Sequence, residues 1–199
     1  MGLRKFFYKI QNKIWIRWSN IRFKDVERFS EKIAPEDVVN NTDEILRLTK
    51  KIYKNFKYKK DGADQLWDAV LPPCYAYKQY KNKDVFKEDC DGFHALLYHC
   101  LVQSSIESYL MSVQTKKSGH CVLIFRLEGI WYVVDYDSIY QAGKTLSEMI
   151  DNYNNVYIEC YESNKLKVKF NGFYTYNYKK GKYKMINLVK RVRKENESK

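Results

Sequence analysis

Residues 118–135 read SGHCVLIFRLEGIWYVVD, and this stretch decides the fold that the sequence predicts. Its two apolar runs, 120–127 and 130–135, have the length and the content of β-branched and aromatic residues expected of buried strands. His120 opens the first strand and Asp135 closes the second. A carboxylate at the end of a buried strand needs a partner, and an imidazole N–H on the neighbouring strand would supply one.

A third chemically important residue, Cys90, lies upstream in the stretch Glu88-Asp89-Cys90-Asp91-Gly92-Phe93. From this point the apolar spacing predicts a buried helix, with Asp89 as its N-cap and with the stripe Phe93, Leu96, Leu97, Cys100 and Leu101. The positive end of a helix favours a thiolate, whereas the flanking Asp89 and Asp91 oppose it unless they cap the helix or face solvent. We therefore expect His120 to supply most of the activation of Cys90, with Asp135 orienting the imidazole.

Alternatives remain at each of these positions. His94 lies four residues after Cys90 on the same helical face and is the rival base. A base on the nucleophile's own helix is poorly placed to be oriented by a third group, so the sequence favours His120. Asp137 shares the strand face of Asp135 by period-two geometry and is the alternative carboxylate. The simplest reading of Cys90 itself is an inert small residue at a helix start.

Three motifs in this order resemble the transglutaminase-like superfamily of papain-fold cysteine enzymes, closest to its bacterial and viral cysteine peptidases. They are Asp89-Cys90-Asp91-Gly92-Phe93, Ser118-Gly119-His120-Cys121 and Trp131-Tyr132-Val133-Val134-Asp135. The lead-in, residues 52–58 followed by Asp61, Trp67 and Pro72-Pro73, is also similar, so that the resemblance covers about residues 42–140. Glu88 stands where the family often has glycine, and Cys121 stands at an alanine-like position.

The resemblance implies a papain-like core, in which the helix of Cys90 packs on a sheet that carries His120 and Asp135. It also implies attack of Cys90 on a carbonyl to give a thioester acyl-enzyme, with His120 protonating the leaving amine. Beyond the backbone N–H of Cys90, the oxyanion donor is left open between Gln79 and Trp67.

The function expected is hydrolysis of a peptide or amide bond in a peptide or protein substrate. Two alternatives stay open: a cross-linking acyltransferase on the same fold, and a catalytically idle binding module that uses its basic termini. We expect no cofactor and no metal. The usual paired spacing of zinc ligands is absent from the sequence. A zinc site would have to draw its ligands from Cys90, His94, His99, Cys100, His120 and Cys121.

The domain organisation expected for the 199 residues is a basic amphipathic N-terminal helix (1–34), one transglutaminase-like domain (35–189) and a basic frayed tail (190–199). Helices come first and mostly antiparallel strands follow, which is an α+β arrangement. Further helices are predicted from Thr42 and over 146–153, and further strands over 107–114, 156–161, 165–170, 173–178 and 183–189. The apolar stripe predicted for the first helix is Leu3, Phe7, Ile10, Ile14, Trp18 and Ile21, and its favoured role is docking on its own domain.

The net charge of +12 is concentrated at the two ends of the chain. Residues 1–24 hold seven basic residues and residues 163–194 hold eleven, without an acid in either range, so the remaining residues sum to −6. These termini are candidates for contact with an anionic surface or nucleic acid. Five widely spaced cysteines favour free thiols and a cytoplasmic location, and no apolar run is long enough for a membrane span.

Overall fold

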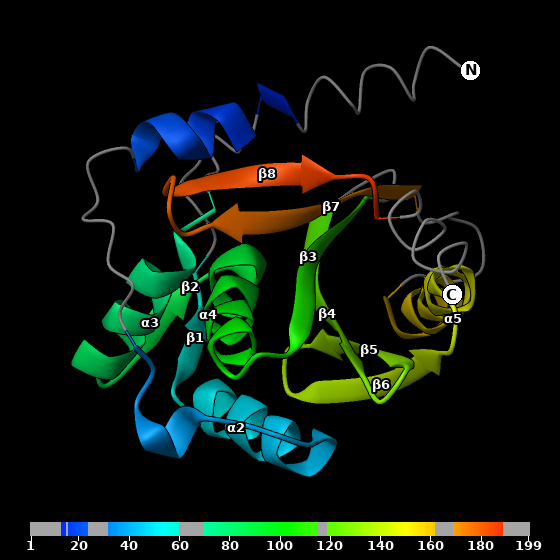
Figure 1. The fold of residues 1–199 in the computed structure, drawn as a ribbon, viewed down its shortest axis with the longest axis horizontal. Coiled ribbons are helices and arrows are strands. Elements are labelled where there is room, and N and C mark those ends of the chain that lie inside the picture. Colours follow the sequence, from blue (N-terminus) through cyan, green and yellow to red (C-terminus); the bar gives the residue numbers. More distant parts are fainter. Residues whose placement is uncertain are drawn as a thin grey trace.

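The computed structural model describes residues 13–14, 16–23, 32–59, 70–114, 119–161 and 169–188 (Figure 1). Residues 13–14 and 16–22 are helical and are called the N-terminal helical segment. The elements that follow are η1 (Pro35–Asp37), α2 (Thr42–Lys54), β1 (Phe56–Tyr58), α3 (Pro73–Asn82), β2 (Phe86–Glu88), α4 (Cys90–Gln103), β3 (Glu107–Gln114), β4 (Gly119–Leu127), β5 (Ile130–Asp135), β6 (Ser138–Gly143), α5 (Leu146–Tyr161), β7 (Lys169–Asn177) and β8 (Lys182–Ile186).

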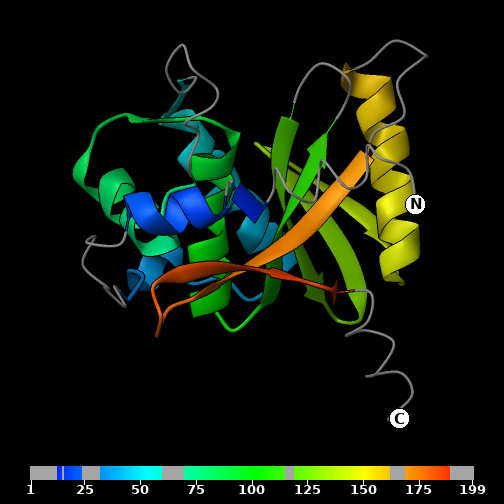
Figure 2. The ribbon, with the colours of Figure 1, turned by 90° about the horizontal axis from the view of Figure 1, so that it is seen from above.

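Six of the strands form one antiparallel sheet in the order β6-β5-β4-β3-β7-β8. The short strands β1 and β2 pair separately and in parallel, and β2 directly precedes the helix that begins at Cys90. Helix α4 packs on one face of the large sheet, and α5 covers the other (Figure 2). The predicted α+β class, with the helix of Cys90 packed on an antiparallel sheet, is confirmed.

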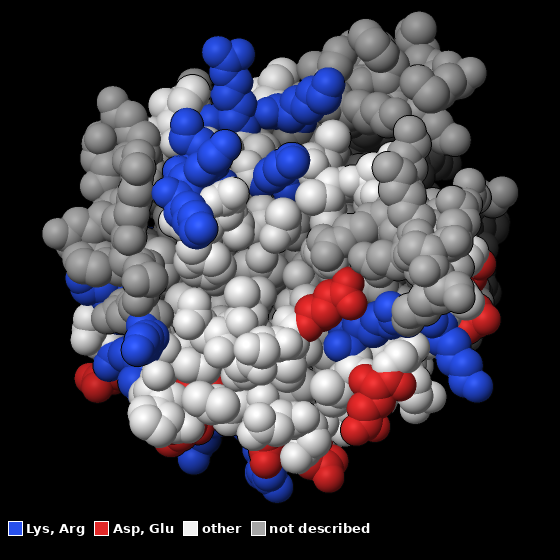
Figure 3. All heavy atoms as spheres, viewed as in Figure 1, with Lys and Arg blue, Asp and Glu red and all other residues white. Residues whose placement is uncertain are grey.

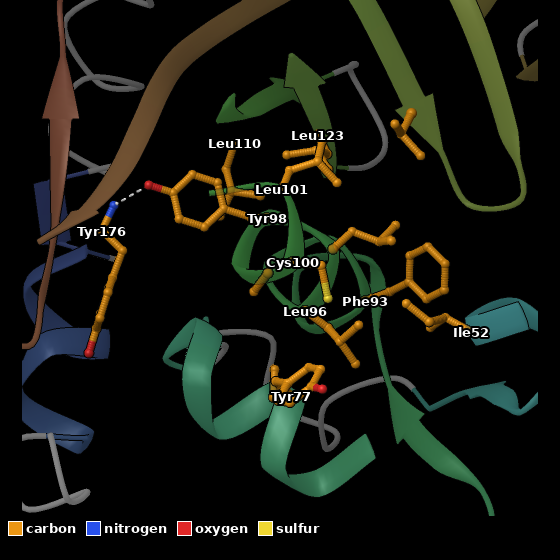
Figure 4. Packing of buried hydrophobic residues seen from close by; sticks show 14 of the residues in the cluster. Ile52, Tyr77, Phe93, Leu96, Tyr98, Cys100, Leu101, Leu110, Leu123 and Tyr176 are labelled. Atoms are coloured by element: carbon orange, nitrogen blue, oxygen red, sulfur yellow. Dashed lines mark hydrogen bonds between the residues drawn. The ribbon is translucent and has the colours of Figure 1, made fainter. Parts of the chain in front are cut away.

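Two hydrophobic clusters lie on the two faces of the sheet, because successive side chains of a strand point to opposite sides. On β4, Leu123 and Phe125 join the cluster around α4, whereas Val122 and Ile124 join the cluster beneath α5. Buried residues of α4 fill the first cluster, where the Tyr98 hydroxyl also accepts a hydrogen bond from the Tyr176 backbone N–H at 3.1 Å (Figure 4). Helix α4 is therefore buried on nearly all sides, which fixes the position of its first residue.

The strands over 107–114, 120–127 and 130–135 were predicted within one residue of their observed bounds. The strand predicted over 156–161 is wrong, because α5 continues to Tyr161. The helical spacing of Leu146, Met149 and Tyr153 buries one face of α5 on the sheet, and this packing outweighs the β-propensity of the residues that follow. Strand β6 was not predicted, and β7 is one strand from Lys169 to Asn177 where two were expected, with residues 165–168 outside the described ranges.

A buried carboxylate, Asp37, ties the helices that precede α4 together. Its two oxygens accept hydrogen bonds from Lys51 Nζ at 2.8 Å, Tyr77 Oη at 2.8 Å and Lys81 Nζ at 3.2 Å. These partners come from α2 and α3, so one charge connects three elements. The hydrogen bonds outweigh the effect of burial and hold the pKa of Asp37 below its ordinary value.

The N-terminal helical segment docks on the same body, but only part of the predicted stripe takes part. Trp18 of the stripe is half-buried, and Leu3, Phe7 and Ile10 lie outside the described ranges. Ser19 accepts a hydrogen bond from the Val70 backbone N–H at 3.1 Å, and Ile16 and Phe23 pack against the α4 cluster. Ile14 and Ile21, which belong to the predicted stripe, are exposed. Ser19 and Asn20 contribute polar contacts to the docked face, which an apolar pattern cannot reveal. Residues 1–12 and 190–199 lie outside the described ranges, and within those ranges no helix is both long and apolar enough to cross a bilayer.

Candidate functional site

Cys90 is the first residue of α4, as the sequence predicts, and its side chain is half-buried. Asp89 is the N-cap: its Oδ1 accepts hydrogen bonds from the backbone N–H groups of Asp91 at 3.1 Å and Gly92 at 3.4 Å. The Asp89 carboxylate is thus engaged in capping. Gly92 is required by close packing, because a Cβ there would lie 2.8 Å from Cβ of Glu88.

His120 and Asp135 are joined by a hydrogen bond between adjacent strands. Nε2 of His120 lies 2.8 Å from Oδ1 of Asp135, and the two side chains are only 12% and 1% exposed. Burial acts to raise the pKa of Asp135, but the hydrogen bond and charge of His120 outweigh it and leave the pKa below its ordinary value. Because an ionised carboxylate only accepts, Nε2–H of His120 is the donor, and Nδ1 is the nitrogen that can take a proton.

A second hydrogen bond to the Asp135 carboxylate comes from α5, which covers the face of the sheet opposite α4. The Tyr153 hydroxyl of α5 donates to Oδ2 of Asp135 at 3.4 Å. Sequence reasoning missed Tyr153, because its position on α5 reads as an ordinary buried residue. Asp137, the alternative carboxylate, accepts a hydrogen bond from the Ser138 hydroxyl at 3.3 Å, so Asp135 is the acid that the structure joins to His120.

His94, the rival base, is engaged with backbone groups through both ring nitrogens. Nδ1 lies 2.6 Å from the carbonyl oxygen of Cys90, and Nε2 accepts a hydrogen bond from the Tyr136 backbone N–H at 3.2 Å. The consistent tautomer is neutral, with Nδ1–H donating to Cys90. Its ring connects the first turn of α4 to the turn after Asp135 and lies 6.0 Å from the ring of His120. The geometry gives His94 a structural role.

The buried ring of His94 makes folding stability depend on pH. Burial lowers the pKa of His94 from 6.5 to about 4. Between these values the unfolded chain binds a proton that the folded chain does not, so the free energy of unfolding falls as the pH decreases. We expect a loss of about 3 kcal/mol from this residue between pH 6.5 and pH 4. Urea denaturation over this range should show a shallower pH dependence in His94→Gln, and equal slopes in the two proteins would contradict the assignment.

Tyr136, which follows Asp135, is a central residue of the site that the sequence does not reveal. Its φ of +51° is in the left-handed region, which is unusual for a bulky residue and concentrates at functional sites. Its ring lies 5.7 Å from the ring of His120, 5.5 Å from that of His94 and 5.8 Å from that of Phe56. The Cys90 thiol is in electrostatic range of the Tyr136 hydroxyl and contributes, after burial, to raising its pKa. The ring of Tyr136 thus lies beside the rings of His120 and His94, and its hydroxyl is within electrostatic range of Cys90.

Gln79, one of the two expected oxyanion donors, accepts a hydrogen bond from Lys83 through its side-chain oxygen on α3. Trp67, the other, lies outside the described ranges. Among the described residues, no group of three potential ligands is arranged to hold a metal ion. Cys74, Cys100 and Cys121 are buried, and in the described part of the chain none of these or Cys90 forms a disulfide.

No protein-family model matches the chain, and no curated protein does. Among the solved structures that match is one described as "a Putative Cysteine Protease from Cytophaga hutchinsonii". The match has 14% sequence identity and a TM-score of 0.38, and it covers 82% of this chain and 52% of that one. The chain therefore spans about half the length of this structural neighbour, and a similarity of this size does not establish a shared family.

Proposed function

We propose that the protein is a transglutaminase-like cysteine hydrolase that cleaves a peptide or amide bond, with Cys90, His120 and Asp135 as its catalytic residues. The observation that carries the proposal is the buried hydrogen bond between His120 Nε2 and Asp135 Oδ1. This bond fixes the tautomer in which Nδ1 of His120 can accept the proton of a thiol. It lies beside Tyr136, whose hydroxyl is within electrostatic range of Cys90.

In the proposed reaction, Nδ1 of His120 takes the proton of Cys90, and the thiolate attacks the carbonyl carbon of the substrate. The tetrahedral intermediate collapses when the C–N bond breaks and His120 returns the proton to the leaving amine. Water, deprotonated by His120, then attacks the thioester, and the carboxylic acid and the thiol are released. The backbone N–H of Cys90, at the N-terminus of α4, is the oxyanion donor that we propose among the described residues.

Selective alkylation tests the proposal, because the buried cysteines serve as internal controls. At pH 6 iodoacetamide should label half-buried Cys90 rapidly in the native protein and leave Cys74, Cys100 and Cys121 unmodified. His120→Ala should lose the rapid labelling of Cys90 and recover it only above about pH 8. Labelling is read by mass spectrometry of the digested protein. Equal, slow labelling of all five cysteines, or rapid labelling of Cys90 in His120→Ala, would favour the idle binding module.

The acyltransferase alternative differs only in which nucleophile opens the thioester. Incubation of the protein with a peptide mixture in water enriched in heavy oxygen, with and without a primary amine, separates the two outcomes. Hydrolysis leaves heavy oxygen in a new carboxyl group. Incorporation of the amine in its place would assign acyl transfer to the same three residues.

A further inference from the structure

The N-terminal helical segment is held at the free edge of the sheet, which fixes the direction of its outer face. β8 is the last strand of the sheet, and Tyr183 lies in its middle. Nδ2 of Asn20 donates to the carbonyl oxygen of Tyr183 at 3.2 Å, and Oδ1 of Asn20 accepts from its N–H at 2.9 Å. The Asn20 amide thus pairs with the edge of β8 as a neighbouring strand would. Segment and strand form one surface (Figure 1).

The outer face of the segment combines apolar and basic side chains. Ile14 is 62% exposed and Ile21 is 50% exposed, although isoleucine is among the residues most often buried. Their spacing of seven residues places them on one helical face, with Arg17 between them. Lys13 and Arg22 are exposed beside them. The segment therefore partly buries Ile16 and Phe23 on its docked face and presents two further apolar side chains among basic ones to solvent.

The β7–β8 hairpin adds further positive charge next to this face. Lys182 and Lys184 flank Tyr183 and point to the side of the strand opposite its buried ring. Lys179 and Lys180 are exposed in the turn. Neither residues 13–23 nor residues 177–188 contain an acid. Figure 3 shows Lys and Arg gathered over these elements at the upper left, without Asp or Glu among them.

We propose that this surface, the basic-apolar patch, binds the anionic surface of a lipid bilayer. It consists of Lys13, Ile14, Arg17, Ile21, Arg22, Lys179, Lys180, Lys182 and Lys184. Charge complementarity selects an anionic partner, because each lysine or arginine near such a membrane contributes about 1 kcal/mol. The two exposed isoleucines favour a bilayer over a nucleic acid, since they can enter the boundary between head groups and acyl chains. The patch lies on other elements than Cys90, so this binding does not depend on the proposed chemistry.

Sedimentation of the full chain with vesicles tests the proposal. The protein should bind vesicles of phosphatidylglycerol and phosphatidylcholine in equal parts, and it should stay in solution with phosphatidylcholine alone. Lys182→Gln with Lys184→Gln should reduce the partition coefficient about 30-fold at low salt. Ile14→Gln with Ile21→Gln should reduce it about tenfold or more, because both positions are exposed and the loss is confined to the bilayer contact.

Matched pairs outside the patch control for net charge and for exposed apolar residues. Lys50→Gln with Lys54→Gln, on exposed positions of α2, removes the same charge. Val38→Gln with Val85→Gln changes side chains that are 42% and 41% exposed. Both control pairs should bind vesicles as the unchanged protein does. The proposal is overturned by absent vesicle binding, by equal losses in the control pairs, or by patch variants that lose binding to duplex DNA or RNA while vesicle binding is unchanged.

Discussion

Replacing Asp135 with alanine should slow the alkylation of Cys90 at pH 6 by about two orders of magnitude. The carboxylate accepts the Nε2–H of His120 and stabilises the imidazolium that forms when the thiol ionises. Without it, Cys90 approaches an ordinary thiol with a pKa of about 8.5, of which only about 0.3% is ionised at pH 6. The measurement is the second-order rate constant for iodoacetamide from pH 5 to pH 9. The pH at which this rate constant reaches half its maximum should be higher in Asp135→Ala than in the native protein.

Asp135→Asn separates the loss of charge from the loss of the hydrogen bond. The asparagine oxygen can still accept the N–H of His120, and its NH2 group can face the Tyr153 hydroxyl, which is 3.4 Å from Oδ2 in the native protein. We therefore expect a rate between those of the native protein and Asp135→Ala. If all three proteins react at the same rate while Cys90 remains the labelled residue, the carboxylate does not orient the base.

The second large effect concerns Phe93, whose ring lies in the core below the site. Phe93 is fully buried, and Figure 4 shows it among the residues of the core. Its ring packs 4.8 Å from the ring of Phe56, 5.2 Å from that of His94 and 5.5 Å from that of Tyr136. Phe93→Ala should lower the free energy of unfolding by about 3–5 kcal/mol, because the lost apolar contacts leave a cavity between α4 and the aromatic residues. Urea denaturation at pH 7 measures the change.

Phe93→Leu is the matched control, since leucine keeps most of the apolar volume. It should cost about 1.5 kcal/mol or less if the neighbours repack. A loss below about 1 kcal/mol in Phe93→Ala, which is under the range for buried phenylalanine, would show that the aromatic cluster does not support α4.

Sequence patterns predicted the parts of the site that have local signals. Asp89 precedes an apolar helical stripe, so its capping of α4 could be read directly. His120 and Asp135 bound two adjacent strands, and their hydrogen bond follows from the pairing of β4 with β5. That these residues act with Cys90 in catalysis remains a proposal.

The other features depend on contacts between distant parts of the chain. Tyr136 has its left-handed backbone in the two-residue turn between β5 and β6, where positive φ angles are usual, and His94, 42 residues earlier, accepts its N–H. The contact with His94 has no signal in the local sequence. Asp37 is buried only because α2 and α3 bring lysines and a tyrosine to it. The exposure of Ile14 and Ile21 was not predicted, because Asn20 binds an edge strand and hydrophobic periodicity cannot detect such a contact.

The contact between Asn20 and β8 also bears on how copies of this protein behave toward each other. An outermost strand with an available N–H and C=O is a template on which a strand from another molecule can add, and such additions propagate into aggregates. At Tyr183 both groups are already taken by one asparagine side chain. The segment that displays the positive charge thereby also blocks strand-by-strand self-assembly at this position, and a chain shortened beyond Asn20 would lose that protection.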